Sequence, residues 1–129
     1  MSECGFIGLG RMGGAMARRL IGAGHRVVVF DVSESARSAL AARGAGIASS
    51  ARAVADTVPI VFLSLPNPEV VVDTMLGTHG AIGGNRLELC VDLSTSGPEA
   101  AIRLSAALAA RGIASLEAPV SGGIKGARE

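Results

Sequence analysis

Three glycines near the start of the chain have the spacing of a phosphate-binding turn. Gly8, Gly10 and Gly13 form the pattern G-x-G-x-x-G directly after a short apolar run. In such a turn the first glycine permits a tight exit from a strand, the second leaves room for a pyrophosphate, and the third lets the next helix pack closely on the sheet. The first N–H groups of that helix have no intrahelical partner and its dipole favours negative charge, so a phosphate fits there. Because the chain has 18 glycines, this spacing needs support from the rest of the sequence.

Asp31 supplies part of that support. It ends the apolar run Val27–Phe30 and follows Gly13 by 18 residues. In dinucleotide-binding folds an acidic residue about 20 residues beyond the glycines accepts hydrogen bonds from the adenosine ribose. A carboxylate there repels a 2′-phosphate, so the sequence predicts NAD as the cofactor, with NADP less favoured. The alternative is that Asp31 is only a polar residue between a strand and a turn.

Alternating strands and helices are predicted to position these residues. Apolar and β-branched runs indicate strands at 4–7, 27–30, 45–48, 59–65, 87–93 and 113–116. Helices are predicted at 11–23, 34–43, 50–55, 68–76 and 99–111. The evidence for them is helical periodicity, caps such as Ser33 and Asn67, and glycines at their ends. In the first helix we expect Met12, Met16 and Leu20 to form the inward stripe. The alternation predicts an α/β fold, a doubly wound parallel sheet of three layers, as a single Rossmann domain over residues 1–129.

The polar and glycine-rich segments all follow the carboxyl ends of predicted strands. In a doubly wound sheet ligands bind beyond these ends, near the point where the strand order reverses. We therefore expect five segments to meet at one edge of the sheet: residues 8–13, 31, 65–66, 94–95 and 121–123. Ser94 and Thr95 also stand where hydroxyls cap a helix, and capping is compatible with contact to a cofactor.

The composition excludes several other classes of protein. The chain has 129 residues, a formal net charge of +1 and three phenylalanines as its only aromatic residues. Scattered basic residues without aromatic partners indicate no nucleic-acid partner, and no apolar run reaches the ~18 residues of a membrane span. The absence of tyrosine excludes a Tyr-x-x-x-Lys active site. Cys4 and Cys90 lie far apart in apolar runs, so we expect two reduced, buried thiols, no metal site and a cytoplasmic protein.

Three motifs resemble a known family, the β-hydroxyacid dehydrogenases of the 3-hydroxyisobutyrate dehydrogenase group. Residues 6–17, FIGLGRMGGAMA, look like its cofactor signature. Residues 92–98, DLSTSGP, resemble its D-x-S-T-x-x-P segment, and residues 118–127 match its substrate segment A-P-V-S-G-G-x-x-G-A. The motifs occur in the family's order and spacing, and the resemblance covers essentially the whole chain.

The resemblance implies the cofactor domain of an oxidoreductase. Such an enzyme transfers hydride between nicotinamide and a small 3-hydroxy acid or its semialdehyde, with an all-helical C-terminal half that makes it a homodimer or homotetramer. The residues implied in cofactor binding are Gly8, Leu9, Gly10, Arg11, Met12, Gly13, Asp31, Val32, Leu65, Pro66, Val70 and Thr95. Those implied in substrate binding are Ser121, Gly122 and Gly123, whose glycines let the backbone approach a carboxylate closely.

The chain departs from the family pattern at two places. Arg19 stands where the signature usually has Asn, which puts that local contact in doubt. The family's catalytic lysine and the asparagine one turn after it belong to a segment beyond Glu129, and Lys125 follows Ser121 too closely to replace that lysine. We therefore expect no catalytic residue in this chain and no turnover by it alone.

Two other functions remain open from the sequence. A stand-alone module that binds NAD without catalysis would share these residues. So would an imine-reducing or chromatin-linked relative that differs in the lysine segment.

Overall fold

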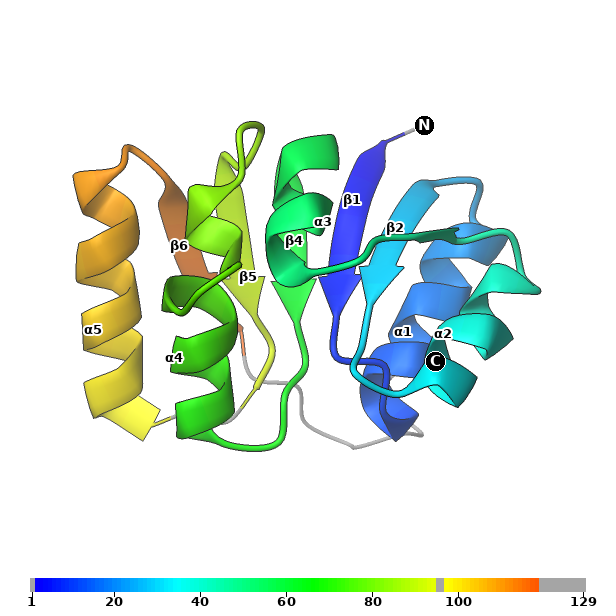
Figure 1. The fold of residues 1–129 in the computed structure, drawn as a ribbon, viewed down its shortest axis with the longest axis horizontal. Coiled ribbons are helices and arrows are strands. Elements are labelled where there is room, and N and C mark those ends of the chain that lie inside the picture. Colours follow the sequence, from blue (N-terminus) through cyan, green and yellow to red (C-terminus); the bar gives the residue numbers. More distant parts are fainter. Residues whose placement is uncertain (1, 95–96, 119–129) are drawn as a thin grey trace.

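The computed structural model describes residues 2–94 and 97–118, which form one α/β domain (Figure 1). Six parallel strands form one sheet in the order β3-β2-β1-β4-β5-β6. The strands are β1 (Glu3–Ile7), β2 (Arg26–Phe30), β3 (Gly46–Ile47), β4 (Ile60–Leu63), β5 (Leu89–Asp92) and β6 (Ala114–Glu117). The helices are α1 (Arg11–Gly22), α2 (Glu34–Ala41), α3 (Ala51–Thr57), α4 (Pro68–Leu76) and α5 (Gly97–Ala110), with a short 3-10 helix η1 (Ala81–Gly83). The predicted doubly wound sheet is confirmed, and its strand order reverses at β1.

Side-chain caps begin three of the helices. Ser33 Oγ accepts the Ala36 N–H at 3.2 Å, and Ser50 Oγ accepts the Ala53 N–H at 3.1 Å. At α4, Asn67 Oδ1 accepts the Val70 N–H at 2.9 Å, and Pro68 occupies a first-turn position where its missing N–H costs nothing. The caps predicted at Ser33 and Asn67 are confirmed.

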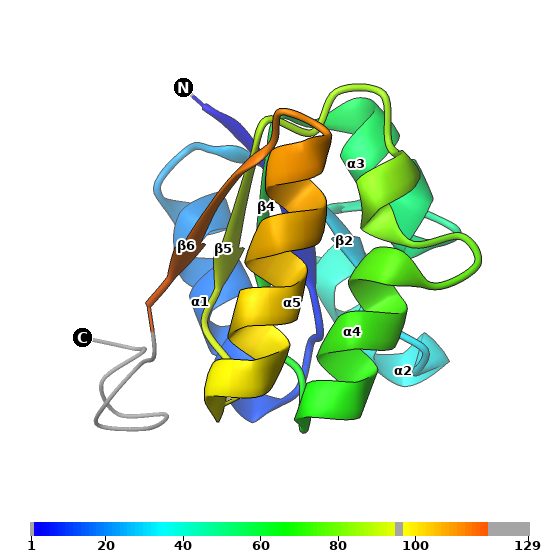
Figure 2. The same ribbon diagram turned by 90° about the vertical axis from the view of Figure 1, so that its left-hand side faces the viewer.

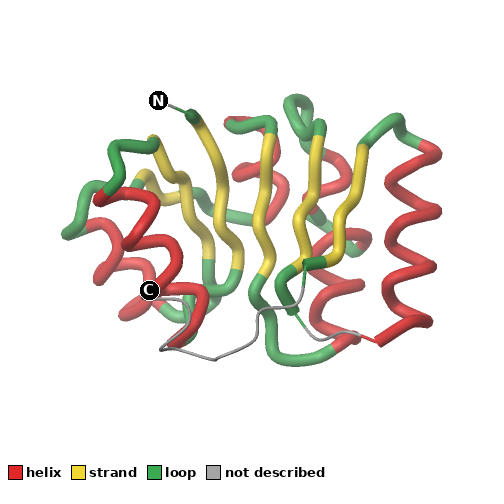
Figure 3. The backbone as a smooth tube through the Cα atoms, turned by 180° about the vertical axis from the view of Figure 1, so that it is seen from behind, coloured by secondary structure: helices red, strands yellow, loops and turns green. Residues whose placement is uncertain are grey.

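The helices cover the sheet in two layers (Figure 2). One cluster joins α3, α4 and α5 to one face of the sheet, with Val54, Met75 and Leu108 fully buried. The other cluster joins α1 and α2 to the opposite face, with Ala17 and Leu40 as their buried side chains. On that second face the described helices cover β2 and β3, while no described helix stands in front of β4 to β6 (Figure 3).

The structure corrects one detail of the prediction. The fully buried positions of α1 are small residues, including Gly13 and Ala17, whereas Met12, Met16 and Leu20 are only half-buried. Met16 and Leu20 still pack against the core cluster on this face, but small residues take the innermost positions because α1 lies close to the sheet. β6 is the last described strand at its edge and is exposed at every position, including Leu116 at 55%.

Within the described residues, no helix is long and apolar enough to cross a membrane.

Gly5 in β1 allows α3 to pack directly on the sheet. A Cβ built there would lie 2.3 Å from Val54 Cγ1 and 3.0 Å from Val58 Cγ2, both of which belong to buried side chains. We expect Gly5→Ala to lower the free energy of unfolding by about 1–3 kcal/mol, because a packed core accommodates an added methyl only with strain. Gly22→Ala is the control, since its Cβ would meet nothing within 4 Å. Gly22→Ala should raise the free energy of unfolding by about 0.5 kcal/mol, because alanine reduces the backbone freedom of the unfolded chain. Urea unfolding of the two variants measures this difference, and equal stabilities would contradict the packing.

The buried thiol of Cys90 makes the free energy of unfolding decrease at alkaline pH. Cys4 and Cys90 are free and buried, as predicted. Burial, and then the charge of Asp92, raise the pKa of the Cys90 thiol from 9.0 to about 12. Above pH 9 the unfolded chain loses this proton while the folded chain keeps it. Stability therefore falls between about pH 9 and 12, by up to about 1.4 kcal/mol per pH unit from this thiol. Urea unfolding across this range measures the slope, which should be shallower in Cys90→Ala; an identical slope in the two proteins would contradict the assignment.

Candidate cofactor site

The carboxyl ends of the strands are aligned across the sheet. Ile7 pairs with Phe30 on one side and with Leu63 on the other, Leu63 pairs with Asp92, and Asp92 pairs with Glu117. The segments that follow these residues therefore leave the sheet at one edge. This confirms the predicted edge for the glycine turn, for residue 31 and for the segments after β4 and β5.

The glycine turn leaves β1 by a conformation that only glycine adopts readily. Gly8 has a φ of +95°, and its N–H donates to the Phe30 carbonyl at 3.1 Å. A Cβ on Gly8 would lie 2.0 Å from the backbone oxygen of Ser64. The turn is therefore fixed between the ends of β2 and β4.

The other two glycines of the motif have different surroundings. A Cβ on Gly13 would lie 2.0 Å from the Gly8 carbonyl oxygen, so α1 approaches the turn too closely for any side chain there. A Cβ on Gly10 would meet nothing within 4 Å, so the space beside Gly10 is open. The close helix packing expected of Gly13 and the open approach expected of Gly10 are both present.

The N-terminus of α1 has free hydrogen-bond donors. Gly10 is its N-cap, without a side-chain cap, and its first turn has no acidic residue. The first helical hydrogen bond runs from the Gly14 N–H to the Gly10 carbonyl at 2.7 Å. The three N–H groups before it, those of Arg11, Met12 and Gly13, have no acceptor within the described residues. Because α2, α3 and α4 are all capped by side chains, the uncapped start of α1 is a feature of this site. A helix start of this kind, with the positive end of the helix dipole behind it, is suited to an anion.

Asp31 connects the glycine turn to the turn that follows β2. Its Oδ2 accepts the Leu9 N–H at 2.6 Å, and its Oδ1 accepts the Ser33 N–H at 2.8 Å. A carboxylate oxygen can accept more than one hydrogen bond, so each oxygen keeps capacity for a ligand hydroxyl. The carboxylate is thus held beside the glycine turn and the start of α1.

The predicted apolar residues lie at the same edge. Val32, directly after Asp31, has a side chain that is 89% exposed. Leu65 and Pro66 follow β4, and Val70 lies half-buried in the first turn of α4. The Leu65 N–H donates to Ser94 Oγ at 2.8 Å. The buried Ser94 hydroxyl therefore holds the loop after β4 to the end of β5.

Four predicted site residues lie outside the described part of the chain. They are Thr95 of the D-x-S-T segment and the substrate residues Ser121, Gly122 and Gly123. Lys125 lies outside it as well. The structure therefore addresses the cofactor half of the predicted site.

Two residues near the site were missed by the sequence reasoning. Ser64 is hydrogen-bonded through its N–H to the Ile7 carbonyl at 2.9 Å, and its own carbonyl faces Gly8. Arg37 of α2 donates from Nη1 to the Asp31 carbonyl at 2.7 Å. The position of Arg37, one helical turn after the cap Ser33, is a signal that could have indicated its proximity to Asp31.

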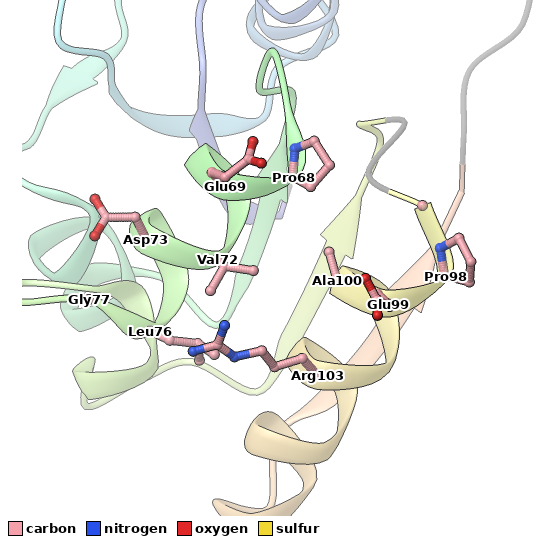
Figure 4. A pocket seen from close by; sticks show the side chains of 11 residues that line it. Pro68, Glu69, Val72, Asp73, Leu76, Gly77, Pro98, Glu99, Ala100 and Arg103 are labelled. Atoms are coloured by element: carbon pink, nitrogen blue, oxygen red, sulfur yellow. The ribbon is translucent and has the colours of Figure 1, made fainter.

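A pocket lies between α4 and α5, away from the glycine turn (Figure 4). It has a volume of about 1010 Å³, and its rim carries Glu69 and Asp73 from α4 with Glu99 and Arg103 from α5. None of its lining residues belongs to the predicted site. Among the described residues no group of His, Cys, Asp and Glu side chains is suited to hold a metal ion. The anion site at α1, beside Asp31, is therefore the better candidate for a cofactor.

The glycine turn, the uncapped helix behind it and the carboxylate after β2 together define a dinucleotide-binding Rossmann domain. A family model described as the NAD binding domain of 6-phosphogluconate dehydrogenase matches residues 3–129, and the chain belongs to that family. A curated relative, the 3-hydroxyisobutyrate dehydrogenase of Pseudomonas aeruginosa, is 42% identical over 129 residues, which cover 99% of this chain and 43% of that protein. The resemblance drawn from the three motifs is confirmed.

Solved structures agree with this assignment. A Mycobacterium tuberculosis 3-hydroxyisobutyrate dehydrogenase with L-serine is 37% identical with a TM-score of 0.90, and the match covers 99% of this chain and 43% of that one. Psf3 in complex with NADP+ and 2-OPP is 38% identical with a TM-score of 0.88, over 97% of this chain and 45% of that one. The chain spans less than half the length of these relatives.

Gly13 can be tested for its packing role. We expect Gly13→Ala to lower the free energy of unfolding by about 1–3 kcal/mol, because the new Cβ meets a backbone oxygen that has no space to move. Gly10→Ala should lower it less, by about 0.5–1 kcal/mol, because its Cβ enters open space and only the poorer capping by alanine counts against it. Denaturant unfolding of both variants gives the comparison. If Gly13→Ala is as stable as Gly10→Ala, the close approach of α1 to the turn is contradicted.

Proposed function

We propose that this chain is the cofactor-binding part of an oxidoreductase that transfers hydride between NAD and a small 3-hydroxy acid or its semialdehyde. The observation that carries the proposal is the uncapped N-terminus of α1 behind an open Gly10. A helix whose first N–H groups have no partner among the described residues and face an open edge is suited to a pyrophosphate. NAD would supply the hydride chemistry when bound, while the protein supplies position and charge.

Each predicted residue has a role in this proposal that its geometry supports. The N–H groups of Arg11, Met12 and Gly13 would bind the pyrophosphate. The Asp31 carboxylate would accept the hydroxyls of the adenosine ribose, and its charge favours NAD over NADP. The exposed side chain of Val32 offers an apolar contact beside that ribose.

The loop after β4 would form the other side of the cofactor cleft. Leu65 and Pro66 leave the sheet next to the glycine turn, because β4 pairs with β1. The bond from the Leu65 N–H to Ser94 fixes this loop against the segment that contains Thr95. Val70 and Thr95 would complete the cleft toward the nicotinamide.

The substrate class rests on the family motifs and on the relatives. Ser121, Gly122 and Gly123 would bind the substrate carboxylate through a hydroxyl and backbone N–H groups. By the same resemblance, the lysine that would move the hydroxyl proton belongs to the all-helical half. We therefore propose that residues 1–129 bind the cofactor but do not turn over substrate.

The compartment and assembly are part of the same proposal. Two free, buried thiols are compatible with a reducing cytoplasm. The sheet face over β4 to β6, which no described helix covers, is compatible with burial by a helical half in a homodimer or homotetramer.

Gly10→Asp separates stability from cofactor binding. The aspartate adds a cap and a negative charge at the start of α1, so the free energy of unfolding should rise by about 0.5–1 kcal/mol. The same charge occupies the pyrophosphate site, so the affinity for NADH should fall at least about tenfold. Titration by NADH fluorescence gives the affinity and urea unfolding gives the stability.

Asp73→Asn serves as the control, because this exposed residue of α4 lies away from the glycine turn. It should bind NADH as the unaltered chain does. The proposal fails if the unaltered chain binds no NADH, or if Gly10→Asp binds it equally well. Oxidation of 3-hydroxyisobutyrate by residues 1–129 alone would contradict the assignment of the proton-transfer residue to the helical half.

A further inference from the structure

We propose that Arg18, Arg19 and Arg43 form a second ligand site, which binds a phosphate dianion, either free or as the monoester of a small molecule. These three arginines and Ala15 line one small pocket, called here the arginine pocket. None of its lining residues belongs to the glycine turn, to the loop after β4 or to residue 31, so it is separate from the candidate cofactor site. Arg19 stands where the family signature usually has Asn. Relatives that keep that Asn lack this set of three, and the inference does not depend on the proposed function.

The backbones of the three arginines are fixed by the helices. Arg18 and Arg19 belong to the second half of α1, and the Arg19 carbonyl accepts the Ala23 N–H at 3.0 Å where that helix ends. The Arg43 N–H donates to the Leu40 carbonyl at 3.0 Å, directly after α2. Both helices pack on one face of the sheet through the same core cluster. The positions from which the three side chains extend are therefore set by the fold.

The small residues of α1 give the Arg18 side chain its place. Side chains of a helix lean toward its N-terminus. Accordingly, Arg18 Nη1 lies 3.9 Å from the position that a Cβ on Gly14 would occupy, and the side chain is half-buried. Ala15, which lines the arginine pocket, is itself buried. The guanidinium thus lies on the surface of α1 above small residues, and a long side chain at residue 14 or 15 would compete with it for that space.

No carboxylate neutralises the arginine pocket within the described residues. The ion pairs there join Glu3 to Arg26 and to Arg86. The helix α1 has no acidic residue, and α2 has only Glu34, in its first turn. No acidic residue lines the pocket. Like charges that share a site repel each other, so a bound anion would remove a cost that the free protein carries.

The chemistry and size of the arginine pocket suit a phosphate group. A guanidinium presents a planar fork of N–H donors that matches two phosphate oxygens. The pocket has a volume of about 380 Å³, which lies at the lower end of the range for small-molecule sites. Ala15 is the one apolar residue that lines it among the described residues, so an uncharged ligand would find little apolar surface. A compact dianion fits these features better than a large or apolar molecule.

Arginines near the ends of helices also offset the helix dipole. That role would account for Arg19 in the last turn of α1 and for Arg43 after α2. It does not require the arginines of two helices to share a pocket. Arg111 offers a matched comparison, because its N–H likewise donates to a carbonyl three residues earlier, that of Leu108, at 3.0 Å. Like Arg43 it precedes a glycine with positive φ, but it does not line the arginine pocket.

The test is an NMR titration of the isotope-labelled chain with sodium phosphate at neutral pH. Sodium chloride keeps the ionic strength constant, so that general screening does not change. We expect saturable shifts of the Ala15 and Arg43 amides, from which the Kd is obtained. Arg19→Asn and Arg43→Gln should each raise this Kd at least about fivefold, whereas Arg111→Gln should change it less than about twofold. Glycerol 3-phosphate in place of phosphate distinguishes the two sources, since a monoester site binds it more tightly and a free-phosphate site binds it more weakly.

Gly10→Asp separates the arginine pocket from the start of α1. It should leave the Kd measured at Arg43 within about twofold of that of the unaltered chain, because it places its charge at the other end of the helix. The proposal is wrong if phosphate shifts only the amides of residues 10–13, or if no saturable shift occurs at the pocket. It is also wrong if Arg111→Gln weakens binding as much as Arg43→Gln.

Urea unfolding of the same variants shows whether the arginines serve only the helix ends. If Arg19→Asn and Arg43→Gln lower the stability but leave the phosphate Kd unchanged, the arginine pocket is not a ligand site. NADH titration of the unaltered chain tests the proposed function separately. Failure of that titration with intact phosphate binding would contradict the proposed function alone, and the reverse result would contradict this inference alone.

Discussion

The close approach of α1 to the end of β1 is the constraint on which the site depends. At Gly13 the helix lies against the carbonyl of Gly8, with no space for a side chain between them. This contact points the N-terminus of α1 at the open edge beside Gly10. The first N–H groups of the helix are left there for water or for a ligand. The same packing explains why the buried positions of α1 are small residues and why its methionines are only half-buried.

Asp31 extends this constraint to the next strand. Through Leu9 and Ser33 its carboxylate joins the glycine turn to the turn before α2, so the two turns are held together. Ser94 does the same on the other side of β1, where its hydroxyl holds the loop after β4. Two polar side chains thus position the loops on both sides of the point where the strand order reverses. A site built in this way is formed before its ligand binds, which lowers the entropic cost of binding.

Charge at this edge is arranged by hydrogen bonds more than by ion pairs. The carboxylate of Asp31 and the guanidinium of Arg37 are each bonded to backbone groups, while the first N–H groups of α1 have no acceptor among the described residues. Backbone partners thus keep the two charged side chains in place beside the start of α1.

The sequence by itself determined the order of strands and helices, the parallel sheet and the roles of Gly8 and Gly13. It could do so because these features depend on local periodicity, on capping residues such as Ser33 and Asn67, and on the conformational freedom of glycine. Only the tertiary structure decided which polar groups meet. The bond from Leu9 to Asp31 spans 22 residues and the bond from Leu65 to Ser94 spans 29, and no local pattern specifies such pairs. Their formation depends on the pairing of β1 with β2 and of β4 with β5, and that pairing brings Arg37, Asp31 and the start of α1 to a single edge of the sheet.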